Sequence, residues 1–372
     1  MTDDLKKQNA LNILFDEPRV TGANLKVIGV GGGGCNAVNR MIEAGINGVE
    51  FIVANTDVQT LDQSKAQIKL QLGAELTRGL GAGSDPDVGR EAAFADAEKI
   101  AEVLSGADMV FITTGLGGGT GTGAAPVFGA IATDMGILTV AVVTKPFGVE
   151  GMKRMRRAEE GLAELRGCAD TVITIPNSRL SEVYGKISIH DAFKKADEVL
   201  LHAVKGISDL ITSTGTINRD FADVRTVMKG RGVAIMGTGS ATGENAAVEA
   251  MRQALESRLL ENSSISGATG ALINFHCPEG TGLEDIQEAV ALVEAEAHED
   301  ADIMFGTVFN ADNEEVSVTL IATGFGNRQS FMAPVTTQDS GSLEGVSRVR
   351  QGNGTNGSED IAVPTFIRRQ AD

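Results

Sequence analysis

Three glycine-rich segments in the first third of the chain constrain its fold more than any other feature. They are GVGGGG at 29–34, GLGAG at 79–83 and GGGTGTG at 117–123. Glycine makes up 46 of the 372 residues, which is about 12% against a usual 7%. The first and third segments each follow an apolar, strand-like run and precede a helix-like run. A strand, a glycine loop and a helix in this order present backbone N–H groups and a positive helix end to an anion.

The alternation of strand-like and helix-like runs predicts an α/β fold. Short apolar runs recur from Leu25 to Asn177, separated by runs with the length of helices. This order indicates a Rossmann-like parallel sheet with helices on both faces. Segment 187–211 then carries one apolar stripe at the 3.6-residue period, which predicts a long central helix leading to a smaller α+β domain. We expect the glycine segments to be loops, with helices beginning at Cys35 and Ala124.

The composition argues against several kinds of protein. The net charge of −18 disfavours a nucleic-acid binder, which needs a basic face. Cys35, Cys168 and Cys277 are far apart and match no zinc-binding spacing, which suits a reducing cytoplasm. The chain has no apolar run of about 18 residues and no signal-peptide core, so we expect an unexported protein without direct membrane insertion. Its four His residues give no support to a His-built metal site or a Ser–His–Asp hydrolase.

The number of glycine segments predicts an enclosed polyphosphate. A dinucleotide fold needs one such loop, whereas this chain has two and a third segment nearby. Neither main loop carries the lysine of a P-loop, and the chain has no Asn-Lys-x-Asp motif, so it is not a P-loop NTPase. Charge neutralisation is therefore assigned to backbone amides, helix dipoles and Mg²⁺. An NAD-dependent oxidoreductase stays open as an alternative, with Asp57 a late candidate for the ribose-binding acid.

Several motifs resemble a known family in residues and in order. GGGTGTG is similar to the signature of the tubulin superfamily, and GVGGGGCNAVNRM, NTD (55–57), TKPF (144–147) and NRDFADVR (218–225) resemble the FtsZ family of bacterial cell-division GTPases. The resemblance runs from about Leu25 to Gly326 and resumes in the C-terminal peptide. It implies a GTPase domain, a long central helix and a second α+β domain. It also implies GTP or GDP as ligand, Mg²⁺ as cofactor, and a cytoplasmic location at the midcell division ring.

The resemblance further implies which residues bind the nucleotide. Asp197 and Asn177 would recognise guanine, and Phe193, also a candidate for core packing, would stack on the ring. Glu150 and Arg154 would meet the ribose and phosphate, although the same spacing suits a surface ion pair. The phosphate contacts would be Gly32, Gly33, Gly34, Cys35 and Asn36 in the first loop, Gly119, Thr120 and Gly121 in the second, and Ala82 and Gly83 near the γ-phosphate. We expect the Cys35 side chain to pack at the helix start, and we assign no residue as a metal ligand.

The segment NRDFADVR carries the catalytic prediction. From the residues alone, Asp220 would be an ordinary helix N-cap. The resemblance instead implies that Asn218, Asp220 and Asp223 position and polarise the water that attacks GTP. It also implies that they serve the nucleotide of the next subunit, so that head-to-tail contact builds an open filament and completes each hydrolytic site.

The expected organisation has six parts. They are a flexible N-terminal tail (1–23), a GTP-binding domain (24–187), the central helix (188–213), a catalytic-loop and C-terminal α+β domain (214–326), a disordered linker (327–358) and a partner-binding peptide (359–372). In the peptide, Phe366 and Ile367 would be apolar anchors and Arg368 and Arg369 charged contacts for membrane tethers and division regulators. A non-enzymatic tubulin-like scaffold and a plasmid-partition relative stay open as alternatives.

Overall fold

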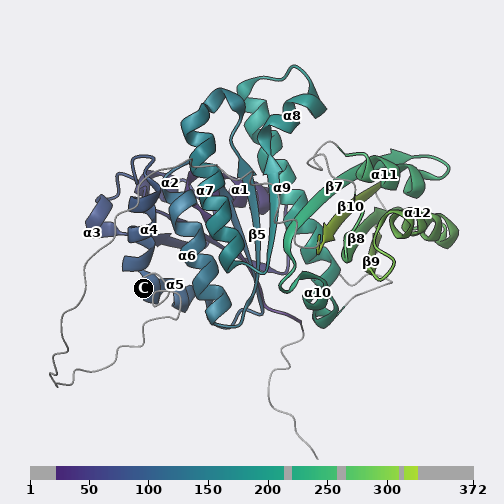
Figure 1. Ribbon diagram of the computed structural model, residues 1–372, viewed down its shortest axis with the longest axis horizontal. Helices are drawn as coiled ribbons and strands as arrows, with labels where there is room; N and C mark the ends of the chain where they lie inside the picture. The colour runs from purple at the N-terminus through teal and green to yellow at the C-terminus, as the bar shows by residue number, and fades with distance from the viewer. Residues whose placement is uncertain (1–21, 213–219, 258–264, 310–313, 326–372) are drawn as a thin grey trace, which may run out of the picture.

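A mostly parallel sheet runs through both halves of the chain. The computed structural model describes residues 22–212, 220–257, 265–309 and 314–325, and within them the sheet has ten strands in the order β3-β2-β1-β4-β5-β6-β7-β10-β8-β9 (Figure 1). The first six strands pair in parallel in the Rossmann order 3-2-1-4-5-6, which confirms the predicted α/β class. The strands are β1 Leu25–Val30, β2 Val49–Asn55, β3 Ile68–Gln71, β4 Met109–Gly115, β5 Leu138–Lys145, β6 Thr171–Pro176, β7 Gly232–Thr242, β8 Gly270–Cys277, β9 Asp302–Phe309 and β10 Glu315–Thr323.

Helices cover both faces of the parallel strands, as predicted. All six residues of β1 are buried, which explains why its sequence is apolar without alternation. One face packs against α1 (Gly31–Glu43) and α9 (Ile189–Thr212). The other packs against α4 (Pro86–Ala95), α5 (Ala97–Leu104), α6 (Thr120–Asp134) and α7 (Met152–Cys168). Shorter helices occupy the connections: α2 Val58–Asp62, α3 Ala74–Thr77, the 3₁₀ turn η1 Gly148–Glu150 and α8 Asn177–Tyr184.

Helix α9 is the predicted central helix. Its 24 residues span about 36 Å at 1.5 Å per residue. In Figure 1 it runs between α8, near the carboxyl ends of the parallel strands, and α10 (Phe221–Met228), near their amino ends. Its apolar stripe, including Leu200, Val204 and Ile207, is buried against the sheet. Gly206 lets the same helix approach the smaller domain, because a Cβ there would lie 2.7 Å from Cγ2 of Thr319.

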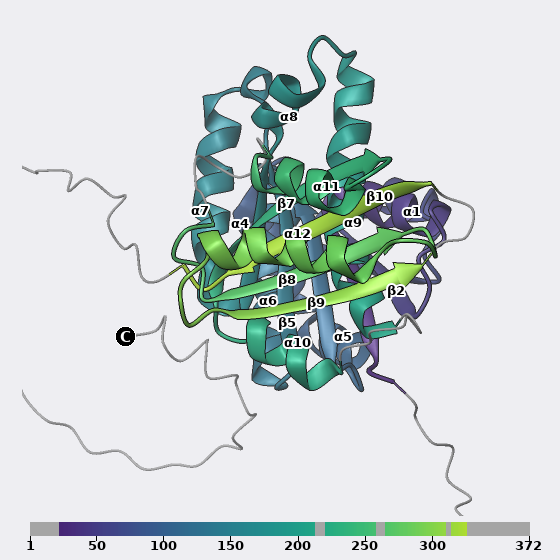
Figure 2. The same ribbon diagram turned by 90° about the vertical axis from the view of Figure 1, so that its right-hand side faces the viewer.

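The smaller α+β domain shares the sheet with the first half. β7 pairs in parallel with β6 through only three residue pairs, from Thr171↔Gly232 to Ile173↔Ala234. β10 then pairs antiparallel with both β7 and β8, and β9 pairs in parallel with β8. Helices α11 (Ala246–Leu255) and α12 (Leu283–Glu296) lie side by side over the outer face of these strands (Figure 2). The predicted second domain is confirmed, and its continuity with the first sheet is an additional finding.

The predicted extent of the two glycine loops was wrong. Helix α1 begins at Gly31 and α6 at Thr120, so most of each segment is the first turn of a helix. The physical reason is close packing on β4: a Cβ on Gly34 would lie 2.4 Å from the Thr113 carbonyl oxygen, and one on Gly121 would lie 2.2 Å from Thr114 Oγ1. Glycine therefore brings each helix start onto the strand.

Other boundaries also differ from the predictions. The helix expected from about residue 90 to 104 is two helices, α4 and α5, which meet at Asp96. The helix expected at 150–166 is the turn η1 followed by α7, and Asn177 begins α8 where a strand end was expected. The linker, the C-terminal peptide and nearly all of the N-terminal tail lie outside the described residues. Within the described helices, none has both the length and the apolar character to cross a membrane.

Candidate active site

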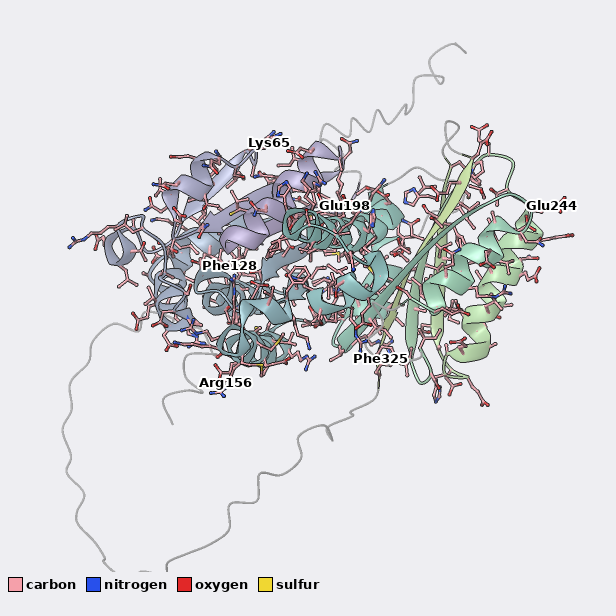
Figure 3. All side chains as sticks on the ribbon, turned by 90° about the horizontal axis from the view of Figure 1, so that it is seen from above. Lys65, Phe128, Arg156, Glu198, Glu244 and Phe325 are labelled. Atoms are coloured by element: carbon pink, nitrogen blue, oxygen red, sulfur yellow. The ribbon has the colours of Figure 1, made fainter. Side chains whose placement is uncertain are left out.

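The two main glycine segments meet at the carboxyl ends of β1 and β4. These strands are neighbours, and β2 pairs with the other side of β1, so the strand order reverses between β1 and β4. Ligands of open α/β sheets bind in the crevice at such a reversal. The segments almost touch there, because a Cβ on Gly31 would lie 2.7 Å from the backbone nitrogen of Gly121. This edge of the sheet, which faces the viewer in Figure 3, is the candidate site.

The first segment presents backbone to open space. Gly32, Gly33 and Asn36 are exposed, and a Cβ on Gly32 would meet nothing within 4 Å. The amides of the first turn of α1 have no intrahelical partners, and Val30 at the N-cap supplies no side-chain bond. A phosphate fits this cradle of free N–H groups. The predicted residues thus divide: Gly32, Gly33 and Asn36 face the site, whereas Gly34 is buried and holds the turn against β4.

Cys35 turns away from the candidate site. Its side chain is fully buried in the core formed by α1 and the sheet. Burial raises the pKa of its thiol to about 12, with a smaller increase from the charge of Asp57 and an opposing hydrogen bond with Asn55. The side chain therefore packs the helix start, as expected, and any ligand contact of Cys35 is through its backbone.

Hydrogen bonds of threonine hydroxyl groups hold the second segment in place. Thr120 Oγ1 lies 2.6 Å from Thr56 Oγ1, and the Gly117 amide donates to Thr122 Oγ1 at 2.8 Å. These bonds fix the first turn of α6, which is buried and whose first N–H groups have no intrahelical partners. Thr56 was not among the predicted site residues, although it lies inside the NTD motif that carried the resemblance.

The third glycine segment closes the same crevice. The Gly81 amide donates to the Thr56 carbonyl at 3.3 Å, and a Cβ on Gly119 would lie 2.9 Å from Ala82 Cβ and 2.8 Å from the Asp85 nitrogen. Gly83 is exposed and has φ +58°, a conformation that glycine favours. Ala82 therefore lies against the second segment, and the approach of Ala82 and Gly83 to a γ-phosphate stays a prediction. Asp85 was missed, although Asp followed by Pro is the N-cap and first-turn signature of α4.

Asp57 is committed to a local structural role. Its Oδ1 accepts from the Gln59 amide at 3.0 Å, and its Oδ2 accepts from Thr60 Oγ1 at 2.9 Å. The carboxylate thus caps α2. This geometry removes the acid that the dinucleotide alternative required.

The segment that follows β5 forms another side of the candidate site. Glu150 Oε2 pairs with Arg154 Nη1 at 2.9 Å, and Glu150 Oε1 accepts from the Phe147 amide at 2.7 Å. The pair does not lie within one helix, because the chain turns at Gly151 with φ +94° between η1 and α7. The backbone of Arg154 packs on the second segment, since a Cβ on Gly117 would lie 2.7 Å from its carbonyl oxygen.

An aromatic pair lies on the same side of the candidate site. Phe147 and Phe193 meet edge to face with ring centroids 5.2 Å apart and planes at 78°. Phe147 is 9% exposed and Phe193 is 43% exposed. Core packing alone therefore does not account for Phe193, whose ring has exposed surface on which a planar group can stack.

Asn177 and Asp197 supply polar groups at reduced exposure. Asn177 is 4% exposed, and its Oδ1 has no hydrogen-bond partner among the described residues. Burial raises the pKa of Asp197 to about 7, although the nearby Arg40 guanidinium lowers it. Arg40 itself pairs with Glu198 at 3.1 Å. An orphaned buried amide oxygen is costly unless a ligand donates to it, so these residues fit a base that offers N–H groups.

The structure does not bring Asp220 and Asp223 to this site. Asp220 is exposed and caps α10, accepting from the Asp223 amide at 2.9 Å. Arg225 donates to the carbonyl of Gly136, just before β5, at 3.3 Å, which places α10 at the amino edge of the sheet. The glycine segments lie at the opposite, carboxyl edge (Figure 1). Asn218 lies outside the described residues.

The described residues contain no group of three or more His, Cys, Asp or Glu suited to hold a metal ion. Mg²⁺ in nucleotide sites is usually held by substrate phosphates with one or two protein oxygens.

Comparison with known proteins agrees with the geometry. Residues 24–185 match the GTPase domain of the tubulin/FtsZ family, and residues 232–326 match the C-terminal domain of the FtsZ family. An empty FtsZ dimer from M. jannaschii has 47% sequence identity and a TM-score of 0.79, covering 82% of this chain and 89% of that chain. A GDP-bound CetZ1 monomer from Haloferax volcanii shares the fold at 21% identity and a TM-score of 0.71, covering 82% of this chain and 95% of that chain.

The folded protein is predicted to resist thiol reagents at pH 8. Burial raises the pKa of the Cys35 and Cys168 thiols to about 12 each, and it also raises the pKa of Cys277, so little reactive thiolate forms. Absorbance with Ellman's reagent should rise slowly for the native chain and show three rapid equivalents in guanidinium chloride. A rapid native equivalent would contradict the raised pKa values of these thiols.

Proposed function

This chain belongs to the tubulin/FtsZ family of GTPases, and we propose that it assembles head to tail into filaments whose subunit contacts complete the hydrolytic site. The observation that carries the proposal is the separation of its two functional groups. The phosphate cradle lies at the carboxyl edge of the sheet, and Asp220 lies at the amino edge. The intervening strands of six to eight residues hold these edges roughly 20–26 Å apart. Asp220 therefore cannot reach the nucleotide of its own subunit.

The distribution of exposed apolar side chains supports assembly through the nucleotide edge. Among the described residues, eleven large apolar side chains are exposed, and eight of them lie around the carboxyl edge: Leu76, Leu80, Val149, Met152, Val183, Tyr184, Ile189 and Phe193. Exposed apolar surface gathered at one place is typical of an interaction site. A second subunit that covers this edge would bury those side chains and the nucleotide together. Because the two contacting edges differ, the contact is heterologous, and we expect successive subunits to add along one axis as an open filament.

Each part of the site then has a defined task. The amides of Gly32, Gly33 and the first turn of α6 hold the phosphates, and the Asn177 and Asp197 side chains accept from the guanine N–H groups. Phe193 stacks on the base. When bound, Mg²⁺ would supply charge neutralisation at the phosphates. Asp220 and Asp223 of the next subunit orient the attacking water, with Asp220 rigid because one of its oxygens caps α10.

The catalytic proposal is tested by separating the charge of Asp220 from its capping bond. Asp220→Asn keeps a capping oxygen but removes the charge, whereas Asp220→Ala removes both, at about 0.5–2 kcal/mol of stability. We expect both variants to bind GTP and to lose nearly all turnover, measured as phosphate release. Turnover by Asp220→Asn at the parent rate would show that Asp220 acts only as the cap of α10 and not in catalysis. A second measurement dilutes the parent protein: specific activity that stays constant at all concentrations would contradict a site built between subunits.

Guanine recognition by Asp197 should make GTP binding depend on pH. Its pKa of about 7 lies above the ordinary value, so the carboxylate that accepts the guanine N–H groups is lost as pH falls below 7. Affinity for GTP should fall up to about tenfold per pH unit below that point. Asp197→Asn should bind weakly between pH 5.5 and 8 with a much flatter profile. A parent profile as flat as that of the variant, measured by equilibrium titration, would remove Asp197 from the base site.

The cellular role follows from the same assignment. We propose that the filament forms the cytoplasmic division ring at midcell and that the peptide 359–372 docks membrane tethers and division regulators through Phe366, Ile367, Arg368 and Arg369. The match of 232–326 to an FtsZ C-terminal domain favours this role over plasmid partition. Deleting 360–372 should leave GTP turnover intact and abolish co-sedimentation with a tether displayed on vesicles. Unchanged tether binding by the truncated filament would refute the docking role.

A further inference from the structure

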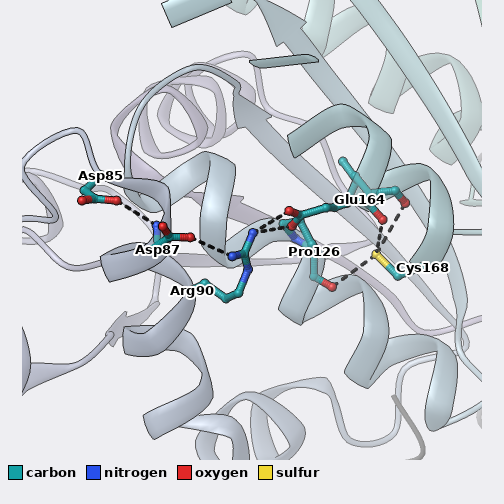
Figure 4. A network of polar contacts seen from close by, with 7 residues as sticks. Asp85, Asp87, Arg90, Pro126, Glu164 and Cys168 are labelled. Atoms are coloured by element: carbon teal, nitrogen blue, oxygen red, sulfur yellow. Dashed lines mark hydrogen bonds and ion pairs between the residues drawn. The ribbon is translucent and has the colours of Figure 1, made fainter. Parts of the chain in front are cut away.

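An arginine that lies outside the nucleotide cradle links the two helices flanking it. Arg90 of α4 and Glu164 of α7 meet across α6, with Arg90 Nη2 2.6 Å from each carboxylate oxygen of Glu164 (Figure 4). Arg90 Nη1 also binds Asp87 Oδ1 at 2.9 Å. Each terminal nitrogen thus serves a different carboxylate, a geometry for which the planar guanidinium is suited and a lysine ammonium is not.

The two linked helices pack directly against the second glycine segment, with no side chain between their backbones and the segment at the contacting glycines. On the α4 side, a Cβ on Gly123 would lie 1.8 Å from the Pro86 carbonyl oxygen, and one on Gly89 would lie 2.6 Å from the Gly119 carbonyl oxygen. On the α7 side, a Cβ on Gly161 would lie 2.4 Å from Thr122 Cγ2. The backbones of α4 and α7 therefore contact the first turn of α6 from opposite sides. The distance between α4 and α7 thus determines the position of this turn.

Each linked helix also leads to a different part of the site. Helix α4 continues directly from the third glycine segment through Asp85, which lies against Gly119. Helix α7 begins beside Gly117 with Arg154, the partner of Glu150. A cavity of about 280 Å³ lies between the two helices and is lined by Asp85, Arg90, Thr122, Arg157 and Glu164, among others. Side chains therefore do not fill the space between α4 and α7, and the Arg90–Glu164 ion pair connects the two helices across it.

We infer that Arg90 is a positioning residue for the γ-phosphate. Through Glu164 it holds α4 and α7 at the separation at which the second and third glycine segments both reach the terminal phosphate. It acts through Gly119 and Asp85 and does not touch the nucleotide. This inference rests on the proposed nucleotide site. Because GDP lacks the group that the third segment approaches, loss of the ion pair should weaken GTP binding more than GDP binding.

The stability and binding effects of Arg90 should be separable. The Arg90 and Glu164 side chains are 29% and 45% exposed, and ion pairs at such exposure contribute little to folding. Arg90→Gln should therefore lower the midpoint of thermal unfolding by less than about 4 °C. The same variant should raise the Kd for GTP about tenfold, since small displacements of a binding loop have large effects on positioning, and the Kd for GDP should change about twofold or less.

The experiment uses the full chain and titrates GTP and GDP separately against the parent protein, Arg90→Gln, Glu164→Gln and the double variant. The double variant should be no worse than either single one, because all three lose the same contact. Arg90→Lys should lie between the parent and Arg90→Gln. Arg252→Gln is the matched control, since it removes the exposed Arg252–Glu249 pair on α11, far from the site.

The outcomes distinguish this inference from the proposed function. Equal losses for GTP and GDP, or losses that follow the thermal midpoint, would assign Arg90 a merely structural role and overturn the inference. An unchanged GTP affinity in Arg90→Gln would overturn it as well. A parent protein that binds GTP and GDP equally poorly would refute the proposed nucleotide site itself. An altered ratio of GTP to GDP affinity in Arg90→Gln, with a parental ratio in Arg252→Gln, is the result that supports the positioning role.

Discussion

The site depends on the close approach of helix starts to the strands at the point where the sheet order reverses. At Gly34, Gly121 and Gly123 a single added carbon would overlap a carbonyl or hydroxyl oxygen of a neighbouring element. These contacts bring the first turns of α1 and α6 together at the carboxyl ends of β1 and β4, and the first N–H groups of both helices have no intrahelical partners. A cluster of lysines is therefore unnecessary for binding an anion there, which is consistent with a chain of net charge −18.

The central helix connects the two edges of the sheet. Helix α9 begins beside the aromatic pair at the carboxyl edge and leads toward α10 at the amino edge. Its length exceeds that of the strands it covers, so the groups at its two ends cannot share one active site within a subunit. Gly206 and the Asn274 side chain, which donates to the Gly206 carbonyl at 3.1 Å, fix the smaller domain against the same helix. Helix α9 thus connects the edge that carries the glycine segments, the helix capped by Asp220, and the second domain.

Much of the fold could be predicted because apolar period and glycine position report local structure directly. The continuous apolar runs of β1, β4 and β5 indicated buried parallel strands, and the stripe through Leu200, Val204 and Ile207 indicated the central helix. Helix boundaries at the glycines were wrong because glycine is a poor helix former in isolation. There, packing against β4 outweighs that propensity. Helices α2, α3 and α8 are short and lack a distinguishing period, so the pattern did not reveal them.

The sequence by itself determined the class of the fold, the glycine segments that form the candidate site and, through its motifs, the family. These are properties of residue type and local order, and they need no knowledge of distant contacts. The tertiary structure alone decided which side chains face the site: Gly32 and Asn36 outward, Cys35 inward, Asp57 onto α2, and Phe193 exposed beside Phe147. It also decided that Asp220 lies across the sheet from the cradle and that Arg90 reaches Glu164 over α6. The reason is that such relations join residues tens of positions apart, and only the packing of helices on a common sheet brings them together.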